Sequence, residues 1–308
     1  MTSHTAKLTP KQAEALRGIL AKRDFESAEV PHAVFSYKRP KLAVTWYKSG
    51  KLLIQGKGTQ EFVEFTLEPE VLGQAAFSDS LDTQPEQLEP RLGVDESGKG
   101  DFFGPLVVAG VYVNEPVARA LDGLGVKDSK AITSDKKIAA LAKGIRKTPD
   151  CVYSVVPIGN ASYNRLHQKM RNVNKILAWG HARVIENLLG QRDRMNPAPL
   201  RAISDQFARS KATIQSALME EGRQLKLVQM HKAESDIAVA AASILARDLF
   251  VQRLSALGRE FDLELPKGAS SKVDAAGAAF LKKHGMDKLG QAAKLHFRTT
   301  QKIQASLL

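Results

Sequence analysis

Four acidic side chains occupy positions where short apolar runs of the chain end. Asp95 and Glu96 follow Leu92–Val94, Asp205 follows a second apolar run, and Glu234 follows a third and precedes a helix-like stretch. An ionised carboxylate away from water is costly unless a cation or a hydrogen-bond donor compensates its charge. Acids at three such points therefore indicate a built site, although an Asp-Glu pair taken alone is also typical of an ordinary loop.

The ligand chemistry of such a site favours a hard cation. The chain has one cysteine, Cys151, so the sequence excludes an internal disulfide and a multi-cysteine zinc site. Carboxylate oxygens select Mg²⁺ or Mn²⁺. Two such ions about 4 Å apart can activate a water and stabilise the entering and leaving oxygens of an in-line phosphodiester displacement. The predicted cofactors are two Mg²⁺ or Mn²⁺ ions per site.

A glycine-rich turn follows the first two acids. Gly98-Lys99-Gly100 separates the run ending at Glu96 from a second strand-like run, Leu106–Val113. Successive strand side chains point to opposite faces, so Asp95 and Glu96 are expected to share a site only where the strand ends. Glycines at that point let the backbone approach a ligand closely.

The run from Asp95 to Leu106 resembles the signature of prokaryotic type 2 ribonucleases H, and specifically of ribonuclease HIII. It is Asp-Glu-Ser-Gly-Lys-Gly-Asp-Phe-Phe-Gly-Pro-Leu, with Gly-Lys-Gly where ribonuclease HII usually has Gly-Arg-Gly. The resemblance implies an Asp-Glu-Asp-Glu set of catalytic metal ligands: Asp95, Glu96, Asp205 and Glu234. Asp95 would bridge the ions, and Asp236 and Asp248 are rivals for the fourth position.

The same resemblance implies an endonuclease that cuts the RNA strand of RNA–DNA hybrids and leaves 5′-phosphate and 3′-hydroxyl ends. The glycine turn would lie against ribose 2′-hydroxyl groups, by which a protein distinguishes RNA from DNA. Hydroxyl and basic side chains before a helix can hold phosphate, and amide and guanidinium groups can donate to phosphate or sugar oxygens. The predicted substrate-binding residues are Ser97, Gly98, Lys99, Gly100, Lys127, Ser129, Lys130, Arg171, Asn172 and Asn174.

The predicted fold class is α/β: a ribonuclease H-like mixed-sheet catalytic domain preceded by a small α+β domain. In the first part we expect a helix over 9–22 and strands over 33–37, 42–47 and 51–55. This part resembles the TATA-binding-protein-like domain of ribonuclease HIII, which binds substrate. The predicted boundaries are an N-terminal domain over 1–66, an acidic proline-containing linker over 67–90 and a catalytic domain over 91–308.

The net charge of +12 is unevenly distributed. Residues 1–60 carry 11 basic and 4 acidic side chains, residues 61–90 carry 8 acidic and no basic ones, and the remainder is basic. Two basic bodies suggest two surfaces for a polyanion. Tyr37, Trp46 and Tyr47, set among lysines, are predicted either to contact nucleic acid or to fill the core.

Other readings stay open at this stage. A ribonuclease HII that cuts at single ribonucleotides in DNA, and a non-catalytic binder of hybrid or double-stranded RNA, are the alternatives. His181, on a predicted helix, is expected to be structural. No apolar run is long enough to span a membrane, and we expect a cytoplasmic monomer.

Overall fold

The computed structural model describes residues 3–72, 88–126, 129, 132–205, 217, 220–230 and 233–305. The chain divides into two compact units, Met1–Thr83 and Gln84–Leu308, and each is described by itself. In the described residues, no helix is both long and apolar enough to cross a membrane.

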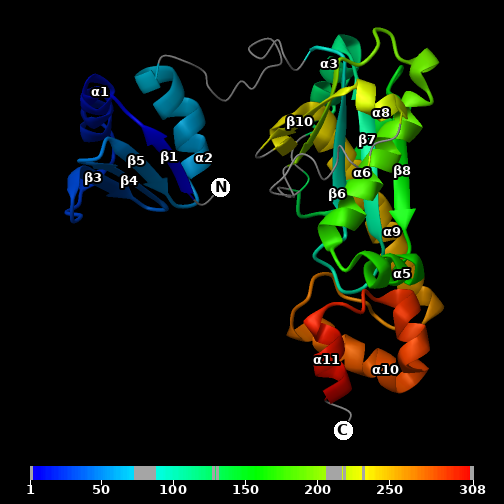
Figure 1. Ribbon diagram of the computed structural model, residues 1–308. Coiled ribbons are helices and arrows are strands. Elements are labelled where there is room, and N and C mark those ends of the chain that lie inside the picture. Colours follow the sequence, from blue (N-terminus) through cyan, green and yellow to red (C-terminus); the bar gives the residue numbers. More distant parts are fainter. Residues whose placement is uncertain are drawn as a thin grey trace. The chain divides into compact units, whose positions relative to one another are not determined.

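The first unit is a small α+β domain with one antiparallel sheet (Figure 1). Its strands lie in the order β1-β5-β4-β3-β2. The elements are β1 (Ser3–Lys7), α1 (Pro10–Ala21), β2 (Glu26–Ser27), β3 (Ala33–Arg39), β4 (Leu42–Tyr47), β5 (Lys51–Gln55), α2 (Thr59–Phe62) and η1 (Val63–Leu72). The predicted helix and three strands are confirmed. Thr9 caps α1 in a reciprocal capping box with Gln12.

The helices cover one face of this sheet. Alternate strand residues such as Val44 and Ile54 pack against residues of α1 and η1, including Leu16 and Leu67. The core thus extends past residue 66, and the predicted domain boundary there falls inside η1. The linker predicted over 67–90 therefore begins too early, because its first apolar residues complete the core of the N-terminal domain.

The aromatic residues of this domain are divided between core and surface. Tyr37 and Trp46 lie beside Phe35, with ring centroids 6.0 and 5.7 Å apart, and belong to the core cluster on the helix side. The core interpretation is correct for these two rings. Tyr47 follows Trp46 on β4 and, by the alternation of strand side chains, points to the opposite face.

The second unit is built on a mixed sheet with the strand order β10-β9-β6-β7-β8. Strand β6 is antiparallel to β7 and parallel to β9, which is parallel to β10. The strands are β6 (Arg91–Ser97), β7 (Leu106–Val113), β8 (Tyr153–Ile158), β9 (Arg201–Asp205) and β10 (Lys226–Met230). The helices are α3 (Glu115–Gly123), α4 (Asp135–Lys147), α5 (Asn160–Met170), α6 (Val173–Leu189), η5 (Arg192–Arg194), α8 (Glu220–Gln224), η6 (Ala233–Ser235), α9 (Ile237–Glu260), α10 (Ser271–Ala292) and α11 (Arg298–Ala305).

Two glycines let helices approach opposite faces of this sheet. A Cβ on Gly93 of β6 would meet the backbone of α9 at Ala238, 2.2 Å away. A Cβ on Gly110 of β7 would meet Val184 of α6 at 2.5 Å. Helices α9 and α6 therefore sandwich β6 and β7, and the all-apolar sequence of β7 follows from burial on both faces.

The C-terminal helices α10 and α11 gather at one end of this unit, where α10 packs against α5 (Figure 1). Helices α5 and α6 follow each other with a break of two residues between them. Arg171 adopts a left-handed conformation with φ 48°, and the Asn172 side chain caps α6.

Candidate active site

The strand register brings two of the four acids side by side. Val94 of β6 lies opposite Ser204 of β9 in parallel register, so Asp95 and Asp205 are the next residues on neighbouring strands. Asp205 in turn lies opposite Met230, the last residue of β10. Glu234 follows that strand within η6. The four predicted acids thus lie at or just after the carboxyl ends of three neighbouring parallel strands, β6, β9 and β10.

A cavity of about 340 Å³ opens at these strand ends. Three of the predicted ligands line it, whereas Glu234 does not. The described residues that line it are Asp95, Glu96, Ser97, Gly98, Lys99, Gly100, Ser129, Asp205, Ser243 and Arg247. The acids and the glycine turn singled out in the sequence therefore meet in one cavity.

Asp95 and Glu96 reach this cavity from opposite faces of β6. The strand extends through Ser97, beyond the end predicted for it, so its side chains still alternate at the acids. Asp95 is on the α9 side with Gly93, and Glu96 is on the α6 side with Val94. The strand was expected to give way to the turn at the two acids, but it continues one residue past Glu96.

Asp95 is a buried acid with a strongly perturbed pKa. Burial, and after it the charge of Glu96, raise the pKa of Asp95 to about 7. A hydrogen bond from Ser243 of α9 acts in the opposite direction. A buried carboxylate beside a second carboxylate is the environment that a divalent cation stabilises.

Glu96 is held by a histidine whose role the sequence analysis missed. Nε2 of His181, a fully buried residue on α6, lies 2.9 Å from Oε2 of Glu96. An ionised carboxylate only accepts hydrogen bonds, so Nε2 is the donor. Lys99 Nζ lies 3.8 Å from the other oxygen, Oε1. The one signal in the sequence was a histidine within an otherwise apolar helix face.

The donor chemistry fits a hard cation, although the ligands do not form a closed cluster. In the described part of the chain, no three His, Cys, Asp or Glu side chains converge closely enough to hold a metal ion. The opposite faces occupied by Asp95 and Glu96 explain part of this separation. The carboxylate oxygens of Asp95, Glu96 and Asp205 around one cavity are the type of ligand that Mg²⁺ and Mn²⁺ prefer.

The structure requires glycine at position 98 of the turn but leaves room for a side chain at position 100. Gly98 has φ +90°, and a Cβ there would lie 2.2 Å from the carbonyl oxygen of Pro105. Its identity is required by the fold. A Cβ on Gly100 would meet no described atom within 4 Å. Because packing leaves room at Gly100, its missing side chain suits close approach of a ligand.

Ser129 lines the cavity but its hydroxyl is turned inward. Ser129 is 3% exposed, and its Oγ lies 2.6 Å from Oγ of Ser243. Arg247, one turn beyond Ser243 on α9, donates to the carbonyls of Ser129 and Ile132 at 2.5 and 2.7 Å. Ser243 and Arg247 were not predicted; their signal is an i, i+4 polar pair inside a buried helix. Lys127 and Lys130 lie outside the described residues.

The predicted substrate residues between α5 and α6 do not line the cavity. Arg171 and Asn172 are exposed at the break between the helices, and Asn172 accepts a hydrogen bond from the backbone of Asn174 at 2.8 Å. This asparagine side chain therefore has a capping role.

The two rival acids are engaged elsewhere. Asp236 pairs with the fully buried Arg91 at 2.7 Å and caps α9 by accepting from the amide of Ala238. Asp248 accepts from Arg146 and Gln252 at 2.8 and 2.9 Å. Neither of these acids lines the cavity, and neither does Glu234, so the fourth ligand stays a prediction.

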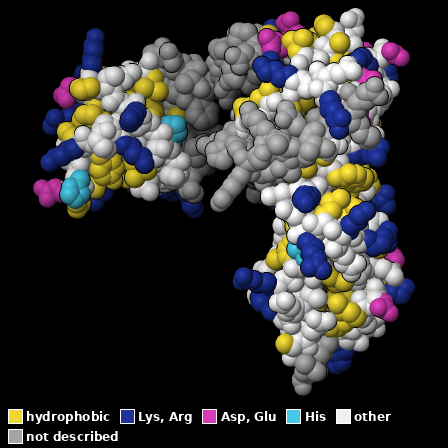
Figure 2. Space-filling model, in the orientation of Figure 1, with side chains coloured by type: hydrophobic (Ala, Val, Ile, Leu, Met, Phe, Trp, Pro, Cys, Tyr) yellow, Lys and Arg dark blue, Asp and Glu magenta, His cyan; other side chains and the backbone are white. Residues whose placement is uncertain are grey.

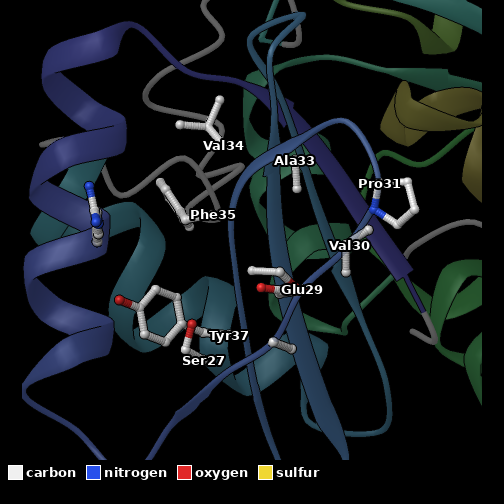
Figure 3. A pocket seen from close by; sticks show the side chains of 11 residues that line it. Ser27, Glu29, Val30, Pro31, Ala33, Val34, Phe35 and Tyr37 are labelled. Atoms are coloured by element: carbon white, nitrogen blue, oxygen red, sulfur yellow. The ribbon is translucent and has the colours of Figure 1, made fainter.

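A larger hollow of about 660 Å³ lies in the first unit, between α1 and the edge of β3 (Figure 3). Its charged lining consists of Arg17 and Glu29, and apolar side chains such as Val34 and Phe35 form much of the remainder. Glu29 is the one acid among the described residues that line it, so we place the chemistry at the smaller cavity beside the Gly98–Gly100 turn.

Comparison with known proteins agrees with the fold and the site. Residues 92–300 match the family described as Ribonuclease HII, and residues 3–74 match a family described as a domain of unknown function (DUF3378). Ribonuclease HIII of Chlamydia trachomatis serovar L2 is 43% identical over 99% of this chain and 98% of its own length. Ribonuclease HIII of Protochlamydia amoebophila is 44% identical, with 95% and 94% covered. The crystal structure of Bst-RNase HIII in complex with Mn²⁺ matches with a TM-score of 0.67 and 34% identity, covering 99% of both chains.

The second unit has a mixed sheet with acids at adjacent strand ends, and the Ribonuclease HII family model matches most of this unit. These features define a ribonuclease H-type phosphodiester hydrolase. The match to Bst-RNase HIII includes the small N-terminal domain. The chain belongs to the ribonuclease HIII family.

Proposed function

We propose that this protein hydrolyses the RNA strand of RNA–DNA hybrids at the cavity beside the Gly98–Gly100 turn, leaving 5′-phosphate and 3′-hydroxyl ends. The observation that carries the proposal is the convergence of Asp95, Glu96 and Asp205 with the glycine turn in one cavity. A protein that only bound polyanions would gain nothing from clustered negative charge.

In this proposal the acids hold Mg²⁺ or Mn²⁺ and the turn holds the substrate. Asp95, Glu96 and Asp205 would be metal ligands, and Glu234, which follows the adjacent strand, would join them. Two ions, when bound, would supply Lewis acidity to an attacking water and to the leaving oxygen. His181 fixes one oxygen of Glu96, and Ser243 donates to Asp95. The open side of Gly100 would admit a ribose 2′-hydroxyl.

The N-terminal domain would contribute a second nucleic-acid surface. The sheet face away from α1 carries the exposed side chains of Lys7 and Lys51, which lie opposite each other on β1 and β5. Figure 2 shows Lys and Arg side chains distributed over the visible face of each unit. Such a face suits the phosphate backbone of a duplex. Monomeric action in the cytoplasm stays a prediction.

The test uses labelled 20-mer duplexes with Mg²⁺, Mn²⁺ or EDTA. The substrates are a full RNA–DNA hybrid, DNA with one embedded ribonucleotide, and double-stranded RNA. We expect metal-dependent cutting at many sites of the hybrid alone. Efficient incision at the single ribonucleotide would reassign the protein to the specificity of ribonuclease HII, and binding without cutting would make it a non-catalytic binder.

Asp95→Asn separates chemistry from binding. The substitution removes the charge that would hold the metal, so we expect cleavage to fall by at least about a thousandfold, in line with other losses of essential catalytic groups. Hybrid binding, measured in EDTA by gel shift, should stay within about threefold of the wild type, because the basic surfaces are unchanged. Cleavage comparable to that of the wild type would contradict the assignment of Asp95.

A further inference from the structure

A lysine is buried next to the glycine turn, where its amino group donates to backbone carbonyls. Lys294, which follows α10, has no exposed surface. Its Nζ donates to two backbone carbonyls, that of Asp101 at 2.8 Å and that of Gly104 at 2.5 Å. These carbonyls begin and end the segment that follows Gly100. A buried ammonium or amine without partners is costly, and here the partners are backbone atoms of one turn.

The segment that Lys294 contacts is joined to the C-terminal elements along its whole length. The amide of Lys294 donates to the carbonyl of Phe102, and the amide of Gly104 donates to the carbonyl of Ala292. Phe103 forms an isolated β-bridge with Ala293. The residues after the turn are thus paired with the residues after α10.

Two further contacts fix the same segment. The amide of Gly268 donates to the carboxylate of Asp101 at 2.6 Å, and the side-chain amide of Asn160 donates to the carbonyl of Gly104 at 2.7 Å. Each end of segment 101–104 therefore has two donors, and Lys294 is the one side chain among these contacts that reaches both ends.

We propose that Lys294 is a positioning residue for substrate recognition: it fixes the backbone that sets the orientation of the Gly98–Gly100 turn towards the bound hybrid. A Cβ on Gly100 would meet no atom of the described residues within 4 Å, so we infer that the anchored residues after it hold its backbone in place. The recognition part of this inference rests on the proposed function. Burial lowers the pKa of Lys294 to about 7, and a neutral amine has two N–H groups, one for each carbonyl.

The test replaces Lys294 by methionine, which has a similar length and no donor. For Lys294→Met we expect KM for the hybrid to rise about tenfold, equivalent to about 1.4 kcal/mol of binding, with kcat within about threefold of the wild type. Hydrogen exchange of peptides covering 98–104 should become faster, while exchange in the central helix α9 stays unchanged. The exchange measurement needs neither metal nor substrate.

Two companion variants make the result specific. Lys302→Met removes a lysine from α11, where it pairs with Asp274 at the surface, and should leave both KM and exchange unchanged. Asn160→Ala releases the carbonyl of Gly104 alone, so it should raise KM by about threefold. It also tests the same anchor if Lys294→Met does not fold.

The outcomes separate this inference from the proposed function. Unchanged exchange over 98–104 in Lys294→Met, or a fall in kcat at constant KM, would overturn the positioning role. If Asn160→Ala and Lys302→Met had the same KM, the anchor would be unimportant for recognition. Failure of the wild type to cut any hybrid would overturn the proposed function instead, and the exchange result would still decide whether Lys294 orders the turn.

Discussion

The contact between His181 and Glu96 predicts that a residue outside the described lining of the cavity affects the geometry of the proposed metal site. The imidazole occupies Oε2, which leaves Oε1 as the oxygen of Glu96 that faces Lys99. An outer hydrogen bond of this kind orients a ligand, and its loss typically costs about 10- to 100-fold in metal affinity or activity.

His181→Phe should therefore weaken Mn²⁺ binding by about tenfold or more, measured by electron paramagnetic resonance without substrate. The ring retains most of the packing volume on α6 but lacks the donor. His181→Gln can restore an N–H donor, so its affinity for Mn²⁺ should lie between those of the wild type and His181→Phe. Equal affinities in all three proteins would show that Glu96 does not depend on this contact.

The glycine turn provides a second test at the residue scale. Gly100→Ala adds a methyl group where packing leaves room, so the melting temperature should change by less than about 2 °C while KM for the hybrid rises several-fold. Gly98→Ala places its Cβ against Pro105 at positive φ and should lower the melting temperature by about 5 °C or more. Equal thermal effects of the two substitutions would contradict the separate roles.

At the scale of elements, strands and their acids were predictable, whereas the partners of those acids were not. Apolar runs ending in Asp or Glu predicted β6 and β9 because a buried strand has a local signature. The contacts of His181, Ser243 and Arg247 depend on which helix face meets the sheet, and that is decided by distant glycines such as Gly93. The predicted boundary at residue 66 was wrong because acidic and proline residues suggested a linker there. The apolar residues between them, such as Leu67 and Val71, pack into the core of the first unit.

The burial of Lys294 against segment 101–104 predicts that the stability of the protein depends on pH. Burial holds the pKa of Lys294 at about 7 in the folded state, below its ordinary value of 10.5. Between these values the unfolded chain binds the proton and the folded chain does not, so the free energy of unfolding should rise as pH increases from about 7 towards 10. Asp101 acts in the opposite direction. Urea unfolding at pH 6, 7, 8 and 9 measures this slope, which should be smaller in Lys294→Met than in Lys302→Met.

At the scale of the whole molecule, the uneven charge suggests that the two units bind one polyanion together. Lys7 and Lys51 lie directly opposite each other on neighbouring strands β1 and β5, on the sheet face away from the helices. Like charges in that arrangement destabilise a sheet. A phosphate backbone lying over them would offset this cost, because each neutralised phosphate releases counterions.

The double variant Lys7→Gln/Lys51→Gln should weaken hybrid binding most at low salt. The slope of log K against log salt should fall in magnitude by about 1 to 2, since each phosphate contact contributes about 0.9. The variant Lys11→Gln/Lys22→Gln has the same net charge, but Lys11 lies on α1, on the other side of the sheet, and Lys22 caps the end of α1. It should retain the wild-type slope. Equal slopes for both double variants would show that only net charge matters, and that the open face of the N-terminal sheet does not contact the hybrid.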